Sequence, residues 1–138
     1  MSFLLDTNVI SEARKPHGNT HVKAWLEQAP EDELFVSVLV LGEVQRGVAL
    51  LRRRDPVQAA IFDQWLARLH QDFTNRILPI TVEIAEEWGR LNVPDPLPII
   101  DGLLAATANV LGLVLVTRNI ADLRNSGVRL INPFEPGH

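Results

Sequence analysis

The chain has 138 residues, of which 46% are apolar and 22% charged, values typical of a single globular domain, here residues 1–138, and unlike a disordered chain. It contains no cysteine, which excludes disulfide frameworks, cysteine-containing zinc sites and cysteine nucleophiles and fits a reducing compartment. A formal net charge of −4 argues against attraction to nucleic acid over the whole surface, and the absence of a membrane-length apolar run predicts a cytoplasmic protein.

The strands and helices expected from apolar spacing alternate along the chain. Residues 3–5 form a short apolar run that predicts a buried strand, followed over residues 7–13 by a helix that Asp6 or Thr7 can cap. A second helix begins after Asn19 and is closed by Pro30. Further strands are expected at residues 34–38, 77–80, 113–116 and, at an edge, 128–131, and further helices at residues 39–53, 55–73, 81–91 and 98–112.

This alternation predicts an α/β fold with a parallel sheet, because right-handed crossovers return the chain to the same edge for each strand. The carboxyl ends of the strands then share one edge, where open α/β sheets form their sites. Asp6 and residues 117–122 follow two such ends. Glu43 and Asp101 lie early in helices that would bring them to the same edge.

Asp101 is the only charged residue in the run of residues 97–117. An acid near a helix N-terminus can simply interact with the helix dipole, which is worth about 0.3–1 kcal/mol at an exposed position. However, Asp6 stands in a similar context, since it directly follows the apolar residues 3–5. Two acids that end or interrupt apolar segments together indicate a site.

Carboxylates that converge in a fold need a cation. A pair about 4 Å apart repels by roughly 4 kcal/mol at an effective dielectric of 20. Oxygen ligands without histidine or cysteine favour Mg²⁺ or Mn²⁺ over zinc. Such an ion suits phosphodiester hydrolysis, because it activates a water and neutralises charge on the attacked phosphate. A Ser-His-Asp alternative is not evident, since the four histidines are expected in loops, at termini or at an exposed helix position.

Two of the predicted helices carry further signals. Gly47 lies one turn after Glu43, and because a glycine inside a helix costs about 1 kcal/mol relative to alanine, it predicts close approach of another group on that face. The helix at residues 55–73 has a broad apolar face. Core packing is the default explanation for this face, and a dimer or partner surface is the alternative. The face consists of Ile61, Phe62, Trp65, Leu66, Leu69 and Phe73.

Five short motifs spread over nearly the whole chain are LLDTNVISE at residues 4–12, GEVQRG at 42–47, IDGLLAATA at 100–108, VTRNIADL at 116–123 and NPF at 132–134. In this order and spacing they resemble the PIN-domain ribonucleases, specifically the VapC/FitB-like toxins of bacterial toxin–antitoxin pairs. The resemblance implies a three-layer α/β/α domain with a central, mostly parallel sheet of four to five strands.

The resemblance also implies an activity, that of an endoribonuclease dependent on Mg²⁺ or Mn²⁺. The acidic triad that holds the metal would be Asp6, Glu43 and Asp101. The polar side chains that support the triad would be Thr7, Asn8 and Thr117.

The fourth acidic position of the family is ambiguous in this chain. Family members often carry an acid two residues after the threonine, where this chain has Asn119, which binds a cation only through its amide oxygen. Asp122, five residues after Thr117, matches a second recurrent acid of the family. We expect Asp122 either to approach the metal as a catalytic residue or to cap the local turn, and a second metal site to be weak.

The partners implied by the resemblance are an RNA substrate, a second copy of the chain in a homodimer, and a cognate antitoxin in a toxin–antitoxin assembly. A segment of the antitoxin would lie over the apolar helices and the acidic cleft. DNA would be bound only through the antitoxin, because this chain has no evident helix-turn-helix or basic groove reader. The candidates for contact with RNA phosphates are Arg14, Lys15, Arg46 and Arg118.

Two alternative functions follow from the same residues. The first is a catalytically silent PIN-like binding or scaffold protein, which would not need Asp6, Glu43 and Asp101 to be intact. The second is a phosphatase with an aspartyl nucleophile, which would need a second acid two residues after Asp6. Asn8 stands at that position.

Overall fold

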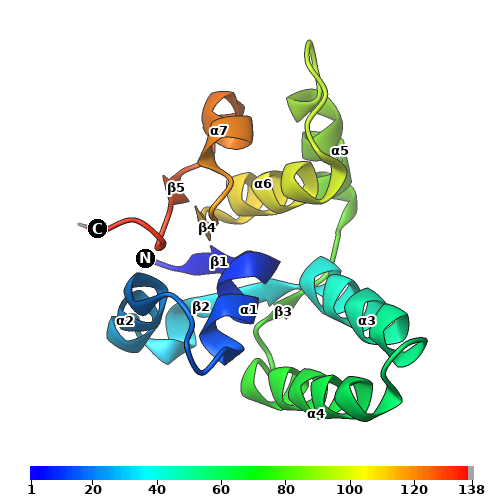
Figure 1. Cartoon of the computed structure of the whole chain (residues 1–138). Coiled ribbons are helices and arrows are strands. Elements are labelled where there is room, and N and C mark those ends of the chain that lie inside the picture. Colours follow the sequence, from blue (N-terminus) through cyan, green and yellow to red (C-terminus); the bar gives the residue numbers. More distant parts are fainter. Residues whose placement is uncertain (137–138) are drawn as a thin grey trace.

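The computed structural model describes residues 1–136 and arranges them around a β-sheet (Figure 1). In these residues the sheet has five strands, β1 (Phe3–Leu5), β2 (Leu34–Ser37), β3 (Ile77–Leu78), β4 (Val114–Val116) and β5 (Leu130–Ile131). Their order is β3-β2-β1-β4-β5, and every neighbouring pair is parallel. The predicted α/β fold with four to five strands is therefore confirmed. The predicted domain of residues 1–138 includes two residues that lie outside the described ones.

Helices cover both faces of the sheet. Within residues 1–136 they are α1 (Thr7–Arg14), α2 (Thr20–Gln28), α3 (Val38–Arg52), α4 (Pro56–Asp72), α5 (Val82–Leu91), α6 (Ile99–Leu111) and α7 (Ile120–Leu123). Right-handed crossovers place α1 to α4 on one face and α5 to α7 on the other. The packing agrees, since α3 contacts α1 and α4 while α6 contacts α5 and α7 (Figure 1).

Short polar side chains determine where five of the helices begin. Asp6, Asn19, Ser37, Asp55 and Thr81 are N-cap residues, and each accepts a hydrogen bond from a backbone N–H of the first turn. Asn19 agrees with the predicted start of the second helix, and of the two candidates for the first helix it is the aspartate that caps. The beginnings of these helices, and hence the side chains near them, are therefore fixed locally.

The core lies on both sides of β1 and β4. Leu4 and Leu115 have no exposed surface. Val9 of α1 and Leu104 of α6, from the two helical layers, are equally buried. The aliphatic run of β4 is buried throughout, as expected for a central parallel strand. This rigid centre holds the carboxyl ends of both strands in place.

The structure differs from the sequence prediction in some details. β2, β3 and β5 are shorter than predicted, and β2 ends at Ser37 because that residue already caps α3. The prediction for Gly47 is wrong, since a Cβ added there would meet no atom of the described residues within 4 Å. The apolar face of α4 is also only partly buried, with Ile61 50% exposed. No helix within residues 1–136 has the length and apolar character to cross a membrane.

Candidate active site

The carboxyl ends of β1 and β4 form the crevice in which the site lies. The two strands are neighbours, with Leu5 paired to Val116, and their crossovers run to opposite faces of the sheet, which is where open α/β folds bind ligands. Asp6 follows β1, and Thr117 follows β4. The Thr117 hydroxyl donates a hydrogen bond to Asp6 Oδ2 at 2.6 Å. Two residues 111 positions apart are thus joined at the bottom of the crevice.

Asp6 is only 6% exposed, and both of its carboxylate oxygens are hydrogen-bonded. Its Oδ1 accepts from the backbone N–H of Thr7 at 2.6 Å. Burial raises the pKa of Asp6, because it disfavours the charged form. The hydrogen bonds from Thr117 and Thr7 oppose this rise, while the negative charges of Asp101 and Glu43 add to it. Both of these acids therefore lie close enough to Asp6 for their charges to interact.

Asp101 lies in the first turn of α6, and two neighbours fix its position. The next residue, Gly102, packs against Trp88 of α5, where an added Cβ would come within 3.2 Å of the indole. A larger residue would therefore require the Trp88 indole to shift by a few tenths of an ångström. The side-chain amide of Asn119 donates a hydrogen bond to Asp101 Oδ2 at 2.5 Å. Because a carboxylate only accepts, the amide nitrogen must be the atom that faces it.

Glu43 reaches the site from α3 and is more exposed than either aspartate. It lies in the second turn of the helix, which begins at Val38, and it is exposed. Its carboxylate accepts a hydrogen bond from the Thr7 hydroxyl. Thr7 therefore links two acids, since its backbone N–H binds Asp6 and its side chain binds Glu43.

These acids share one hollow, which we call the acidic pocket, with a volume of about 600 Å³. Its residues come from the ends of β1 and β4 and from the first two turns of α1, α3 and α6. One of its oxygens, Asn8 Oδ1, is buried and has no hydrogen-bond partner in the described residues. The lining consists of Asp6, Thr7, Asn8, Ser11, Glu43, Asp101, Arg118 and Asn119.

The oxygen atoms in the acidic pocket that could ligate a metal fit a hard divalent cation. They are carboxylate oxygens and an unpartnered amide oxygen, without histidine or cysteine, which is the chemistry that Mg²⁺ and Mn²⁺ prefer. As the side chains stand, no three acidic or histidine residues among residues 1–136 are placed to hold a metal ion together. The hydrogen bonds give a reason, since Thr7 holds Glu43 and Asn119 holds Asp101.

The structure places the predicted triad and its polar support in one region, with Thr117 buried behind Asp6. Asn119 also lines the acidic pocket. Asp122 differs, because it is exposed in α7 and is not among the described residues that line the pocket. In the described residues α7 has no side-chain cap either. Neither of the two roles expected for Asp122 is therefore supported by a contact.

Sequence reasoning missed Ser11 as a site residue. Ser11 lies one turn after Thr7 on α1 and lines the acidic pocket. The signal that could have found it is this spacing of four residues, which places both hydroxyls on the same face of a helix.

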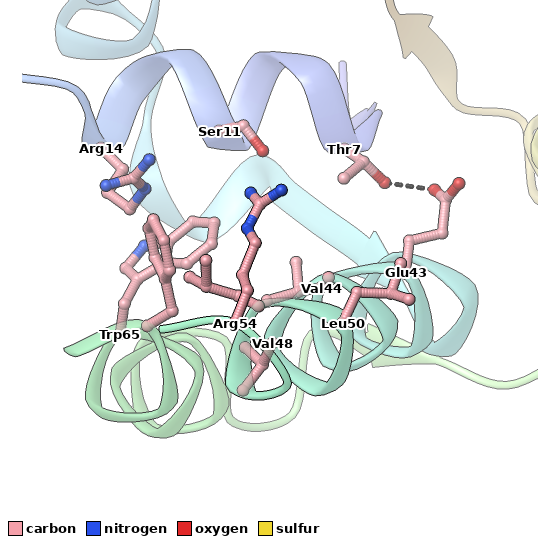
Figure 2. A pocket seen from close by; sticks show the side chains of 12 residues that line it. Thr7, Ser11, Arg14, Glu43, Val44, Val48, Leu50, Arg54 and Trp65 are labelled. Atoms are coloured by element: carbon pink, nitrogen blue, oxygen red, sulfur yellow. Dashed lines mark hydrogen bonds between the residues drawn. The ribbon is translucent and has the colours of Figure 1, made fainter. Parts of the chain in front are cut away.

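A second hollow, which we call the apolar groove, adjoins the acidic pocket and has a volume of about 460 Å³. It lies between α1 on one side and α3 and α4 on the other (Figure 2). Thr7, Ser11 and Glu43 border both hollows. The other residues that line the groove are Arg14, Val44, Gly47, Val48, Leu50, Leu51, Arg54, Phe62 and Trp65.

The far end of the apolar groove carries an arginine on aromatic rings, which the sequence did not predict. The Arg14 guanidinium lies 4.3 Å from the ring centre of Phe62 and 5.3 Å from that of Trp65. Figure 2 shows Arg14 and Trp65 at one end of the groove and the hydrogen bond between Thr7 and Glu43 at the other. Apolar and charged walls thus meet in one continuous depression.

Comparison with known proteins assigns the chain to a family. The family model of the PIN domain matches residues 3–125. Toxin FitB of Neisseria gonorrhoeae is 31% identical over 139 residues, which cover 96% of this chain and 98% of FitB. VapC ribonuclease Y4jK of Sinorhizobium fredii is 29% identical, with 97% of this chain and 99% of the relative covered. A solved structure of FitAB bound to the IR36 DNA fragment superposes with a TM-score of 0.89 at 28% identity, covering 99% of this chain and 98% of the other.

Fold and site define an α/β protein with a carboxylate-lined pocket at the carboxyl edge of a parallel sheet. The chain belongs to the PIN-domain family, a family that includes ribonucleases, and within it to the VapC/FitB-like toxins of type II toxin–antitoxin systems.

Proposed function

We propose that this chain is a metal-dependent endoribonuclease and the toxin of a toxin–antitoxin pair. The observation that carries the proposal is that Asp6, Glu43 and Asp101 line one pocket although they come from three distant segments. Burying Asp6 among like charges is costly, and a bound cation would offset that cost. The names of the relatives support the same activity, since Y4jK is a VapC ribonuclease.

We propose that Asp6, Glu43 and Asp101, with the free oxygen of Asn8, hold Mg²⁺ or Mn²⁺. When bound, such an ion activates a water and neutralises charge on the phosphate. The protein's own contribution is orientation. Thr117 and Thr7 fix both oxygens of Asp6, and Asn119 fixes one oxygen of Asp101.

A ligand role for Asp122 stays a hypothesis, as does the homodimer. The measurement that decides the role of Asp122 is Mn²⁺ binding by the wild type and by Asp122→Asn. A loss of binding in the variant would support ligation, and unchanged binding would exclude it. Since Asp122 does not line the acidic pocket in the described residues, we expect unchanged binding.

The proposed protein partner is an antitoxin that covers the apolar groove. The groove is continuous with the acidic pocket through Thr7, Ser11 and Glu43, so a segment lying in it would also restrict access to the acids. Leu50, at its wall, is 53% exposed and offers apolar surface that a partner segment could cover. The relative FitAB is bound to DNA in its solved structure, and for this chain we propose that DNA is bound through the antitoxin.

The test of the proposed function is RNA cleavage in the presence of Mn²⁺ by the purified wild type and by Asp6→Asn and Asp101→Asn. We expect the wild type to cut RNA internally and each variant to lose at least about a hundredfold in rate, because even outer-shell partners of metal ligands are worth 10–100-fold. The matched control is Asp32→Asn, since Asp32 is an exposed acid before the amino end of β2. Full activity in either pocket variant would contradict the assignment of the site to these carboxylates, and no cleavage by the wild type would favour a catalytically silent binding protein.

A further inference from the structure

Arg118 lines the acidic pocket as its only basic residue in the described part of the chain. It is exposed, and within residues 1–136 it forms no ion pair with a carboxylate. An arginine that served only to neutralise the acids would form an ion pair with one of them, because hydrogen bonds between charged groups are stronger than those between neutral groups. The guanidinium therefore stands at the pocket without a direct ion pair in the described residues, although its charge interacts at longer range with that of Glu12.

The guanidinium is instead held on an aromatic ring. It lies 3.8 Å from the ring centre of Phe134, a distance typical of a cation–π contact. A guanidinium stacked in this way still presents its N–H groups at the edge, where they match the geometry of a phosphate. Phe134 thus holds the guanidinium in place without occupying its hydrogen-bond donors.

Phe134 is itself fixed by the C-terminal motif Asn132-Pro133-Phe134. The Asn132 side chain accepts a hydrogen bond from the backbone N–H of Phe134 at 3.0 Å, and Pro133 is buried. The motif follows β5, and the backbone N–H of Thr117 binds the carbonyl of Ile131 in that strand at 2.9 Å. The C-terminal segment is therefore connected directly to the loop that carries Arg118.

The side chains of the residues on both sides of Arg118 are held to the acids of the pocket. Thr117 donates to Asp6 and accepts from the backbone N–H of Asn119 at 3.0 Å. Asn119 donates to Asp101. The position of the arginine relative to Asp6 and Asp101 is therefore fixed by three hydrogen bonds.

The other basic candidates are placed differently. Lys15 pairs with Glu12 at 3.2 Å. Arg14 lies over Phe62 and Trp65 in the apolar groove. Arg46 is exposed on α3 and does not line the acidic pocket as described. Arg118 alone among the four combines access to the pocket with a fixed orientation.

We propose that Arg118 binds a phosphate of the RNA strand that enters the acidic pocket and that Phe134 is the positioning residue for its guanidinium. The proposal rests on the proposed nuclease function, since it assumes an RNA substrate. It assigns the C-terminal motif a role in substrate binding and not only in closing the fold.

The experiment measures binding of a fluorescein-labelled, short random-sequence RNA by anisotropy over a series of NaCl concentrations, in EDTA so that no cleavage occurs. We expect Arg118→Ala to weaken binding about tenfold and to reduce the slope of log K against log salt by about 0.7, the value for one phosphate contact on a single strand. Arg118→Lys should restore the slope but only part of the affinity, because lysine lacks the planar fork. Arg68→Ala, an exposed arginine of α4 that lines neither hollow in the described residues, should change neither value.

For Phe134 the informative pair is Phe134→Leu and Phe134→Trp. We expect the leucine variant to bind about two- to fivefold more weakly, the value of an exposed cation–π contact, and the tryptophan variant to bind as the wild type. Thermal unfolding shows whether each variant is folded, and the salt slope of a folded Phe134→Leu should stay near the wild-type value. If folded Phe134→Leu bound RNA with wild-type affinity, Phe134 would not be a positioning residue.

Wild-type affinity and slope in Arg118→Ala would overturn the proposal, as would the absence of RNA binding by the wild type. The outcome for the nuclease function is separate. If the wild type cleaves RNA with Mn²⁺ and Arg118→Ala binds RNA normally, only the assignment of Arg118 fails. If the wild type binds RNA through Arg118 but never cleaves it, only the nuclease function fails.

Discussion

The acidic pocket and the apolar groove lie side by side but are built in opposite ways. In the acidic pocket the aspartates are tied by hydrogen bonds to neighbouring segments, as Asp6 is to Thr117 and Asp101 to Asn119. In the apolar groove the walls are helix side chains packed on the core, such as Val44 and Val48. Glu43 stands at the boundary and borders both hollows.

The two hollows should therefore respond differently to mutation. The pocket depends on the exact direction of a few polar atoms, so a change of one atom, as in Asp→Asn, should be enough to inactivate it. The groove depends on shape and apolar area, so it should tolerate conservative exchanges and fail when a charge is introduced. Chemistry and partner binding should therefore be separable by mutation.

The largest expected effect comes from placing a charge in the groove. Leu50→Glu should weaken binding of the antitoxin by about a hundredfold or more, because burying an unpaired carboxylate costs roughly 3 kcal/mol. The variant should still cleave RNA, since Leu50 is 53% exposed and does not line the acidic pocket as described. Leu111→Glu, at a position 47% exposed at the end of α6, is the matched control. Equal loss of cleavage and antitoxin binding in Leu50→Glu would show that the two hollows act as one site.

A smaller effect, on the number of metal ions bound, is expected from placing an acid at position 119, where family members often carry one. Asn119→Asp would replace the amide that donates a hydrogen bond to Asp101 by a second negative charge. Without metal, the two carboxylates would repel each other. With metal, the new carboxylate would be an additional ligand. We expect isothermal titration to give about one Mn²⁺ per chain for the wild type and a second equivalent for the variant. The same stoichiometry in both proteins would show that Asn119 does not limit the number of metals.

The smallest expected effect is on stability. Because burial raises the pKa of Asp6 above its unfolded value of 3.8, the folded state binds the Asp6 proton more tightly than the unfolded state. The metal-free wild type therefore gains stability from this group as the pH falls through the raised pKa. Asp6→Asn should be the more stable protein at neutral pH in EDTA, and its advantage should shrink in acid. Urea unfolding at several pH values measures this difference, which a pH-independent gap between the two proteins would contradict.

Much of the fold and most of the site follow from sequence patterns. The alternation of apolar runs and capped helices predicts the parallel sheet, and Asp6 and Asp101 are recognisable because charged residues are rare in their surroundings. The role of Glu43 is implied by the resemblance to the PIN-domain ribonucleases. The common pocket of the three acids follows from the geometry of a parallel sheet, in which strand ends share an edge.

Other features could not be read from the sequence because they depend on packing between distant elements. The stack of Arg118 on Phe134 joins residues from two separate loops, and no local pattern encodes it. The sequence predicts a close contact at Gly47, but this residue is exposed and lines the apolar groove, where no described atom lies within 4 Å of an added Cβ. Asp122 follows a family pattern, yet the direction of α7 leaves it exposed.

The most direct test of the proposed metal site is an anomalous difference map from crystals of the protein grown with Mn²⁺. We expect a peak in the acidic pocket bordered by the carboxylates of Asp6 and Asp101, and no peak there in crystals of Asp101→Asn. The absence of a peak in the wild type at Mn²⁺ concentrations that support RNA cleavage, or a peak only at other carboxylates, would contradict the account.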